Sequence, residues 1–162
     1  NKWKELKRNV KEENEFYWNT NRIPDGYYQA KVIASDDLDN PLELALREEV
    51  ESDTFLIDNT RPVISNLKTD IEGDSTDSHG SSGYSIIVSG IAKDEMCNIT
   101  DIQYSINSGE WQTAFPEDKI FDSTEETFLL KIPYISPDEH TIVVNAIDHE
   151  GNIGSSRIVF NP

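Results

Sequence analysis

The residues best placed for chemistry in this 162-residue chain are its acids, because 31 Asp and Glu face only 14 Lys and Arg. Catalysis needs groups held in a fixed mutual geometry, and the usual sequence signatures of such groups are missing. No serine lies in a G-x-S-x-G turn, and His79, His140 and His149 are too scattered for an H-E-x-x-H zinc motif. Carboxylate pairs of the glycosidase kind cannot be singled out among so many acids. We therefore expect no catalytic residue and no cofactor-binding residue.

Acidic and amide side chains beside predicted turns favour a hard cation instead. Ca²⁺ takes six to eight oxygen ligands, which several loops can supply together. Asp and Asn also favour turns for conformational reasons alone, so these residues are candidates rather than assigned metal ligands. Calcium is the one ion that the sequence suggests, and its candidates are Asp25, Asp58, Asn59, Asp94 and Asp148, with Glu95 and Glu150 beside the last two.

Aromatic rings offer a second binding chemistry, recognition of a carbohydrate or peptide. A β-sheet core also needs large rings, and core placement is the expectation that we adopt. Exposed indoles would instead favour the recognition surface. The residues concerned are Trp3, Trp18 and Trp111, with Tyr17, Tyr27 and Tyr84.

Composition narrows the possible partners. The net charge of −17 repels phosphate backbones, so we expect no nucleic-acid partner and no attraction to anionic membranes. No run approaches the roughly 18 apolar residues of a membrane helix, so we expect no membrane insertion. Cys97 is the single cysteine, which rules out an internal disulfide and a C-x-x-C zinc site, and we expect a buried thiol.

An internal match organises the chain into two units. Residues 26–36 resemble residues 138–148 at an offset of 112, and the same offset pairs Phe16 with Phe128 and Asn40 with Asn152. The units predicted are 1–61 and 62–162. Relative to the second unit, the first lacks about 48 residues at its start, so we expect the native polypeptide to continue upstream.

The elements that must position these residues are short strands. In the second unit we predict strands at 63–67, 84–91, 99–106, around Trp111, 128–132, 142–147 and 158–160. Asn107-Ser108-Gly109 is typical of a hairpin turn, whereas the polar stretch 72–83 predicts a loop. The first unit holds one possible helix, at 42–49.

The motifs that close each unit carry a family resemblance. Residues 24–28 and 32–36, followed by 55–60 and Pro62, resemble the end of bacterial fibronectin-III-like modules. His140, Val144, Ala146, Asp148 and Gly151-Asn152 are similar to the equivalent part of bacterial Ig-like modules. The resemblance implies an all-β fold: an antiparallel Ig/fibronectin-III-like β-sandwich in which residues 62–162 form one complete module. Residues 1–61 would be the C-terminal half of another.

The resemblance also implies roles for particular side chains. Tyr28 occupies the place of the corner tyrosine, whose hydroxyl bonds a nearby backbone carbonyl, and His140 takes that place in the second unit as a structural hydrogen-bonder. The topology brings Asp25, Asp58 and Asn59 to the joint with Asp94 and Asp148. It places Asp36, Asp37 and Asp39 at the opposite end of the first unit.

The function implied is that of a non-catalytic interaction or spacer module of a larger secreted or cell-surface protein. Two alternatives stay open: the accessory end of an exported hydrolase whose active site lies upstream, or a calcium-braced adhesion module. The expected partner is protein, either the upstream part of the same polypeptide or another chain that completes residues 1–61. The expected location is secreted, periplasmic or cell-surface.

Overall fold

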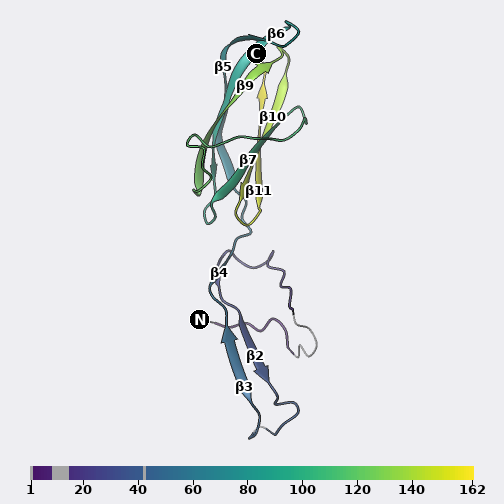
Figure 1. Cartoon of the computed structure of the whole chain (residues 1–162), viewed down its shortest axis with the longest axis vertical. Helices are drawn as coiled ribbons and strands as arrows, with labels where there is room; N and C mark the ends of the chain where they lie inside the picture. The colour runs from purple at the N-terminus through teal and green to yellow at the C-terminus, as the bar shows by residue number, and fades with distance from the viewer. Residues whose placement is uncertain (1, 9–14, 42) are drawn as a thin grey trace.

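The computed structural model describes residues 2–8, 15–41 and 43–162, and these residues form an all-β, antiparallel structure with no helix. Figure 1 shows an elongated molecule: the strands before residue 58 occupy one end, and the strands after residue 62 occupy the other. The all-β prediction is confirmed.

The C-terminal strands form two sheets. One sheet has the order β5-β6-β9, from β5 (Val63–Thr76), β6 (Ser82–Lys93) and β9 (Glu125–Ile135). The other has the order β11-β10-β7-β8, from β7 (Ile99–Ile106), β8 (Gln112–Thr113), β10 (His140–Asp148) and β11 (Ile153–Phe160). Every pairing is antiparallel, and the two sheets face each other across a shared core.

Period-two alternation explains why these strands bury one face. Along β10, alternate residues Ile142, Val144 and Ala146 are fully buried, and between them lie half-buried residues. The opposite sheet contributes Val88 from β6 and Phe128 from β9, both fully buried. Burying a side chain of this size contributes roughly 1.5–3 kcal/mol, so this alternation is what holds the two sheets together.

The predicted loop at 72–83 is wrong in extent, because most of it belongs to a long β5–β6 hairpin. The ladder continues to the pair Thr76↔Ser82, which leaves residues 77–81 as the turn. The Asp77 carboxylate closes that turn by accepting the backbone N–H groups of His79 and Ser81. The stretch is polar because β5 is an edge strand whose outer residues face water, and a polar composition does not prevent pairing there.

The N-terminal strands form two small two-stranded sheets. β1 (Gly26–Tyr28) pairs with β4 (Phe55–Ile57), and β2 (Lys31–Ser35) pairs with β3 (Arg47–Glu51). On β2, the Lys31 ammonium lies 3.1 Å from a Glu49 oxygen and 4.4 Å from the Trp3 ring centroid. These contacts join β2 to β3 and to the segment that contains Trp3, although most side chains of the N-terminal strands are exposed.

The possible helix at 42–49 is wrong where the structure describes it. Leu42 lies outside the described residues, residues 43–44 form a turn, and Arg47 begins strand β3. Pairing with β2 supplies the backbone hydrogen bonds that a short helix would otherwise provide, and a two-turn helix has little stability of its own.

Two predicted hydrogen-bonding roles are confirmed. The Tyr28 hydroxyl donates to the backbone oxygen of Pro24 at 2.6 Å, the bond expected of a corner tyrosine. His140 is buried, with Nδ1 2.9 Å from the Asn107 side-chain nitrogen and Nε2 3.1 Å from the Ser136 hydroxyl. Both ring nitrogens of His140 are therefore engaged in structural contacts.

The expected core placement of the aromatic residues is wrong for several of them. Trp3 and Trp111 are 44% and 49% exposed, and Tyr17 and Tyr27 are exposed still more, whereas Trp18 and Tyr84 are half-buried. Trp111 lies just before β8, the two-residue strand at the edge of its sheet. The Trp3 ring lies under the Lys31 ammonium.

Candidate functional site

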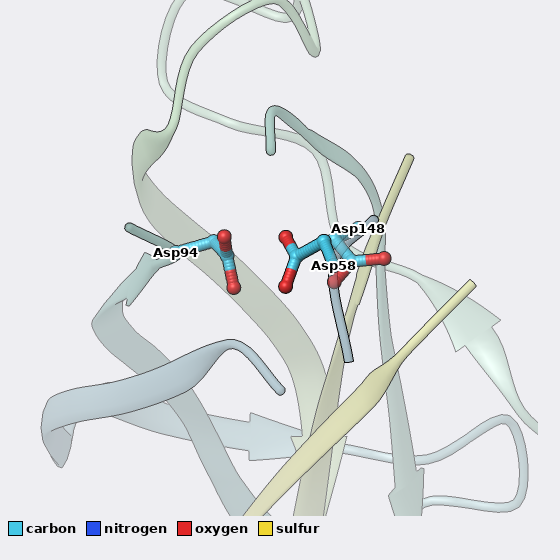
Figure 2. Close-up of side chains that lie close together, drawn as sticks. All are labelled: Asp58, Asp94 and Asp148. Carbon is cyan, nitrogen blue, oxygen red and sulfur yellow. The ribbon is translucent and has the colours of Figure 1, made fainter. Parts of the chain in front are cut away.

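Three aspartates from separate parts of the sequence meet where the N-terminal strands give way to the facing sheets. Asp58 directly follows β4, Asp94 directly follows β6, and Asp148 is the last residue of β10. Figure 2 shows the three side chains gathered together, with Asp94 on one side and Asp58 and Asp148 on the other. β6 and β10 both end at the end of the facing sheets where the linker, residues 58–62, enters them (Figure 1).

This aspartate cluster, Asp58, Asp94 and Asp148, is almost completely buried. Their exposed fractions are 6%, 3% and 2%, and each offers one carboxylate oxygen within 4.8 Å of those of the other two. Carboxylates are among the side chains least often buried without a partner of opposite charge. Such an arrangement calls for a physical explanation.

Backbone N–H groups orient the cluster. One oxygen of Asp94, Oδ1, accepts from the N–H groups of Met96 and Cys97 at 2.8 and 2.9 Å. Asp58 Oδ1 accepts from the N–H of Thr60 at 3.0 Å. Each of these aspartates thus closes its own tight turn, which fixes the carboxylate in place and leaves its second oxygen, Oδ2, turned away from the turn.

Asp148 is oriented differently, by one asparagine. Its Oδ1 accepts from the backbone N–H of Asn152, and its Oδ2 accepts from the Asn152 side-chain amide at 2.9 Å. The same amide nitrogen lies 3.0 Å from the backbone oxygen of Asp58. Asn152 therefore links the turn after β10 to the linker after β4.

Two oxygens in the cluster have no hydrogen-bond partner. Asp58 Oδ2 and Asp94 Oδ2 are buried and unbonded within the part of the chain that the structure describes. Among these same residues, no lysine, arginine or histidine forms an ion pair with any of the three aspartates. Three like charges thus share a site that has little access to water, which costs several kcal/mol per ion unless something compensates them.

Cys97 lies beside the cluster and is buried, as expected for its thiol. Burial, first of all, and then the nearby Asp58 carboxylate and the other negative charges around the thiol raise the pKa of Cys97 to about 12. The thiolate is the reactive form of cysteine, so this side chain is chemically inert at neutral pH.

The other predicted site residues lie nearby but serve the N-terminal side of the joint. The Asp25 carboxylate accepts the Thr60 hydroxyl and, at 2.7 Å, the backbone N–H of Asn59. The Thr60 bond first, and then the Asn59 bond, lower the pKa of Asp25. The Asn59 amide donates to the backbone oxygens of Thr20 and Ile23 at 3.0 and 2.9 Å. Neither side chain belongs to the aspartate cluster, so only three of the five candidates are brought together.

The remaining acids divide only in part as the sequence predicted, because Glu95 and Glu150 were also candidates for the joint. Glu95 and Glu150 are exposed beside the cluster rather than part of it. Asp36, Asp37 and Asp39 belong to the β2–β3 connection, which Figure 1 places at the end of the N-terminal strands farthest from the joint. The predicted absence of these three aspartates from the joint is confirmed.

Two contributors to the joint were not predicted, Asn152 as a link to Asp58 and Gly154 as a point of close approach. A Cβ on Gly154, in β11, would collide with the backbone of Pro62, so a residue without a side chain is required there. The internal match of Asn152 with Asn40 signalled a turn residue, but no sequence pattern indicated that its amide reaches the linker.

No protein-family model matches this sequence, and no curated protein matches it. Among solved structures, it is similar to the sulfane dehydrogenase SoxCD from Paracoccus pantotrophus. That likeness has 20% identity and a TM-score of 0.39, over 54% of this chain and 23% of the other, and it carries no argument about function. Among the described residues, no helix is long and apolar enough to span a membrane.

Proposed function

We propose that this chain is a non-catalytic spacer or interaction element, built from Ig-like or fibronectin-III-like β-sandwich modules, in a larger secreted or cell-surface protein. The observation that carries the proposal is the joint between residues 58 and 62, which is bonded to structure on both sides. A spacer must hold a defined distance and direction between its ends, and a bonded linker does so.

Contacts on the N-terminal side tie the linker to its own unit. Asn59 bonds two backbone oxygens, of Thr20 and Ile23, and Asp25 receives both the Asn59 N–H and the Thr60 hydroxyl. On the C-terminal side, Asn152 bonds the backbone of Asp58, and Pro62 packs directly on Gly154. A flexible tether would lack such paired contacts.

The module type is supported by three features. Facing antiparallel sheets of three and four strands enclose one core, the number of strands suits a sandwich domain of about a hundred residues, and Tyr28 makes the corner hydrogen bond. Such folds host many functions, so the functional part of the proposal rests on the joint and not on the fold.

The histidines also fit a structural role. His140 has both nitrogens in contact with neighbours, and His79 lies exposed in the β5–β6 turn with Nδ1 3.2 Å from the Ser78 hydroxyl. Two open hollows on the described surface lie beside β8 and β9 and beside the β5–β6 hairpin, and neither of these two includes a histidine or the aspartate cluster.

Small-angle X-ray scattering of the whole chain tests the spacer function. We expect an elongated particle, as Figure 1 draws it. We expect Asn59→Ala to shorten and broaden the distance distribution by freeing the linker. A compact wild-type particle would contradict the proposal. So would hydrolase activity in this chain that is abolished by replacing one specific Asp or Glu.

A further inference from the structure

We propose that the aspartate cluster binds one Ca²⁺ ion, which closes the joint between the N-terminal strands and the facing sheets. The ion site is argued from its own residues. Its role in stiffening the joint rests on the proposed spacer function. Binding and stiffening are therefore measured separately below.

Burial is the first argument. All three aspartates are more than nine-tenths buried, yet no basic side chain in the described chain pairs with them. A buried carboxylate without compensation either takes up a proton or attracts a cation. Three of them side by side would add mutual repulsion, which a divalent ion between them would offset.

The unbonded oxygens are the second argument. In Asp58 and Asp94, Oδ1 accepts backbone N–H groups, whereas Oδ2 is buried and has no hydrogen-bond donor. Leaving a buried acceptor unsatisfied costs about 1–3 kcal/mol, and more when the group is charged. These two oxygens belong to the carboxylates that converge with Asp148, where an ion would satisfy them at once.

The spacing of the oxygens indicates which ion fits. Ca²⁺ binds oxygen at about 2.3–2.6 Å, so two ligands on opposite sides of the ion lie about 5 Å apart at most. All three cluster oxygens fall within 4.8 Å of one another, which lies inside that limit. Mg²⁺ binds at about 2.0–2.1 Å and accepts separations only up to about 4 Å, so Ca²⁺ tolerates the whole range.

The chemistry of the ligands also favours Ca²⁺ over softer metals such as Zn²⁺. The cluster offers carboxylate oxygens alone, and neither the Cys97 sulfur nor any histidine nitrogen of the described residues belongs to it. Zinc sites are usually built from Cys and His, whereas calcium sites are built from carboxylates, carbonyls and water. The exposed Glu95 and Glu150 add negative charge at the rim, which favours a divalent cation over a monovalent one.

The site would link parts of the chain that are far apart in sequence. Asp58 belongs to the linker, whereas Asp94 and Asp148 close turns at the end of the facing sheets. An ion bound by all three would fix the linker against the sheets in addition to the single Asn152 hydrogen bond. Removing the ion would leave repulsion between the same groups.

Thermal unfolding of the whole chain in EDTA, in 5 mM CaCl2 and in 5 mM MgCl2 tests ion binding. Calcium binding to the folded state alone must raise Tm, and we expect a rise on the order of 10 °C for wild type, with a smaller rise in MgCl2. In Asp94→Asn, whose amide oxygen can still accept the N–H groups of Met96 and Cys97, we expect the calcium effect to vanish. Asp74→Asn, on the exposed side of β5, is the matched control and should retain the full effect.

The Tm values of wild type and Asp94→Asn in EDTA distinguish an ion-binding role of Asp94 from a purely structural one. If the cluster is a cation site, Asp94→Asn removes a repelling charge and should melt in EDTA at or above the wild-type Tm. The proposal fails if calcium leaves the wild-type Tm unchanged, or if it shifts Asp94→Asn as much as wild type. A Tm rise with no narrowing of the scattering distance distribution would keep the ion site and overturn only its stiffening role.

Discussion

The two hairpins related by the internal match share a local structure and differ almost completely in burial. β10 pairs with β11, and the matching N-terminal stretch forms β1 and β2, which pair with β4 and β3. Val144 in β10 is fully buried, whereas its counterpart Val32 in β2 is 70% exposed. The alternating sequence pattern is compatible with paired strands in both places. The apolar side chains are buried only in β10, where a second sheet faces them.

The aspartates that end these hairpins differ in the same way. Asp148 accepts the N–H of Asn152 at 2.8 Å, and its counterpart Asp36 accepts the N–H of Leu46 at 2.7 Å. Each carboxylate closes a connection between paired strands. Asp148 alone is buried beside two further aspartates, so the same residue in the same local role becomes part of a site only where other loops converge on it.

The largest contrast should come from the two matched phenylalanines. Phe128 is fully buried between the facing sheets, and Phe16 is 48% exposed. Phe128→Ala should lower the free energy of unfolding by about 3–5 kcal/mol, because it removes a large ring and leaves a cavity. Phe16→Ala should change it by less than about 1 kcal/mol. Urea unfolding followed by circular dichroism measures both, and equal losses would refute the contrast in burial.

A second, smaller contrast uses the matched valines. Val144→Ala should cost about 2–3 kcal/mol, since it deletes two buried methyl groups from the core. Val32→Ala should stay within about 0.5 kcal/mol, as expected for an exposed position. Chemical denaturation with the same probe compares them directly. A large loss for Val32→Ala would show that another surface covers β2 in solution.

The smallest expected effect concerns the corner tyrosine. Tyr28→Phe removes only the hydroxyl that donates to Pro24, and should cost at most about 1 kcal/mol because the bond is exposed. The change should be confined to the N-terminal strands, so amide hydrogen exchange should speed up near Pro24 and stay constant in β10. Faster exchange in the core strands would contradict a local role for this bond.

Much of the facing sheets could be predicted because their strands alternate strongly and their turns carry specific residues. Asn107 and Ser108 have positive φ and close a two-residue turn with a Gly109 N–H to Ile106 bond, as the Asn-Ser-Gly pattern indicated. The polar second half of β5 could not be predicted, because an edge strand does not need an apolar pattern. The helix predicted at 42–49 is wrong because helix-forming residues can also form a strand when a partner strand, here β2, is available.

The site could be predicted in part. Turn position and topology sufficed to bring Asp58, Asp94 and Asp148 to one joint, because each directly follows or ends a strand. Asp25 and Asn59 were predicted to join them, and instead they form hydrogen bonds among the residues before Arg61. Short polar side chains next to a turn readily bond nearby backbone groups, which accounts for the difference. Burial and the unbonded oxygens depend on how the loops pack, which no pattern in the sequence specifies.

Isothermal titration calorimetry of the EDTA-stripped chain with CaCl2 tests the central claim most directly, because it measures binding without reference to stability. The account predicts one Ca²⁺ per chain, lost in Asp148→Asn and retained in Asp36→Asn, the matched residue of the exposed hairpin. Absence of binding to wild type would contradict the claim. Binding that survives in Asp148→Asn would contradict it equally, because the ion would then lie elsewhere on this acidic chain.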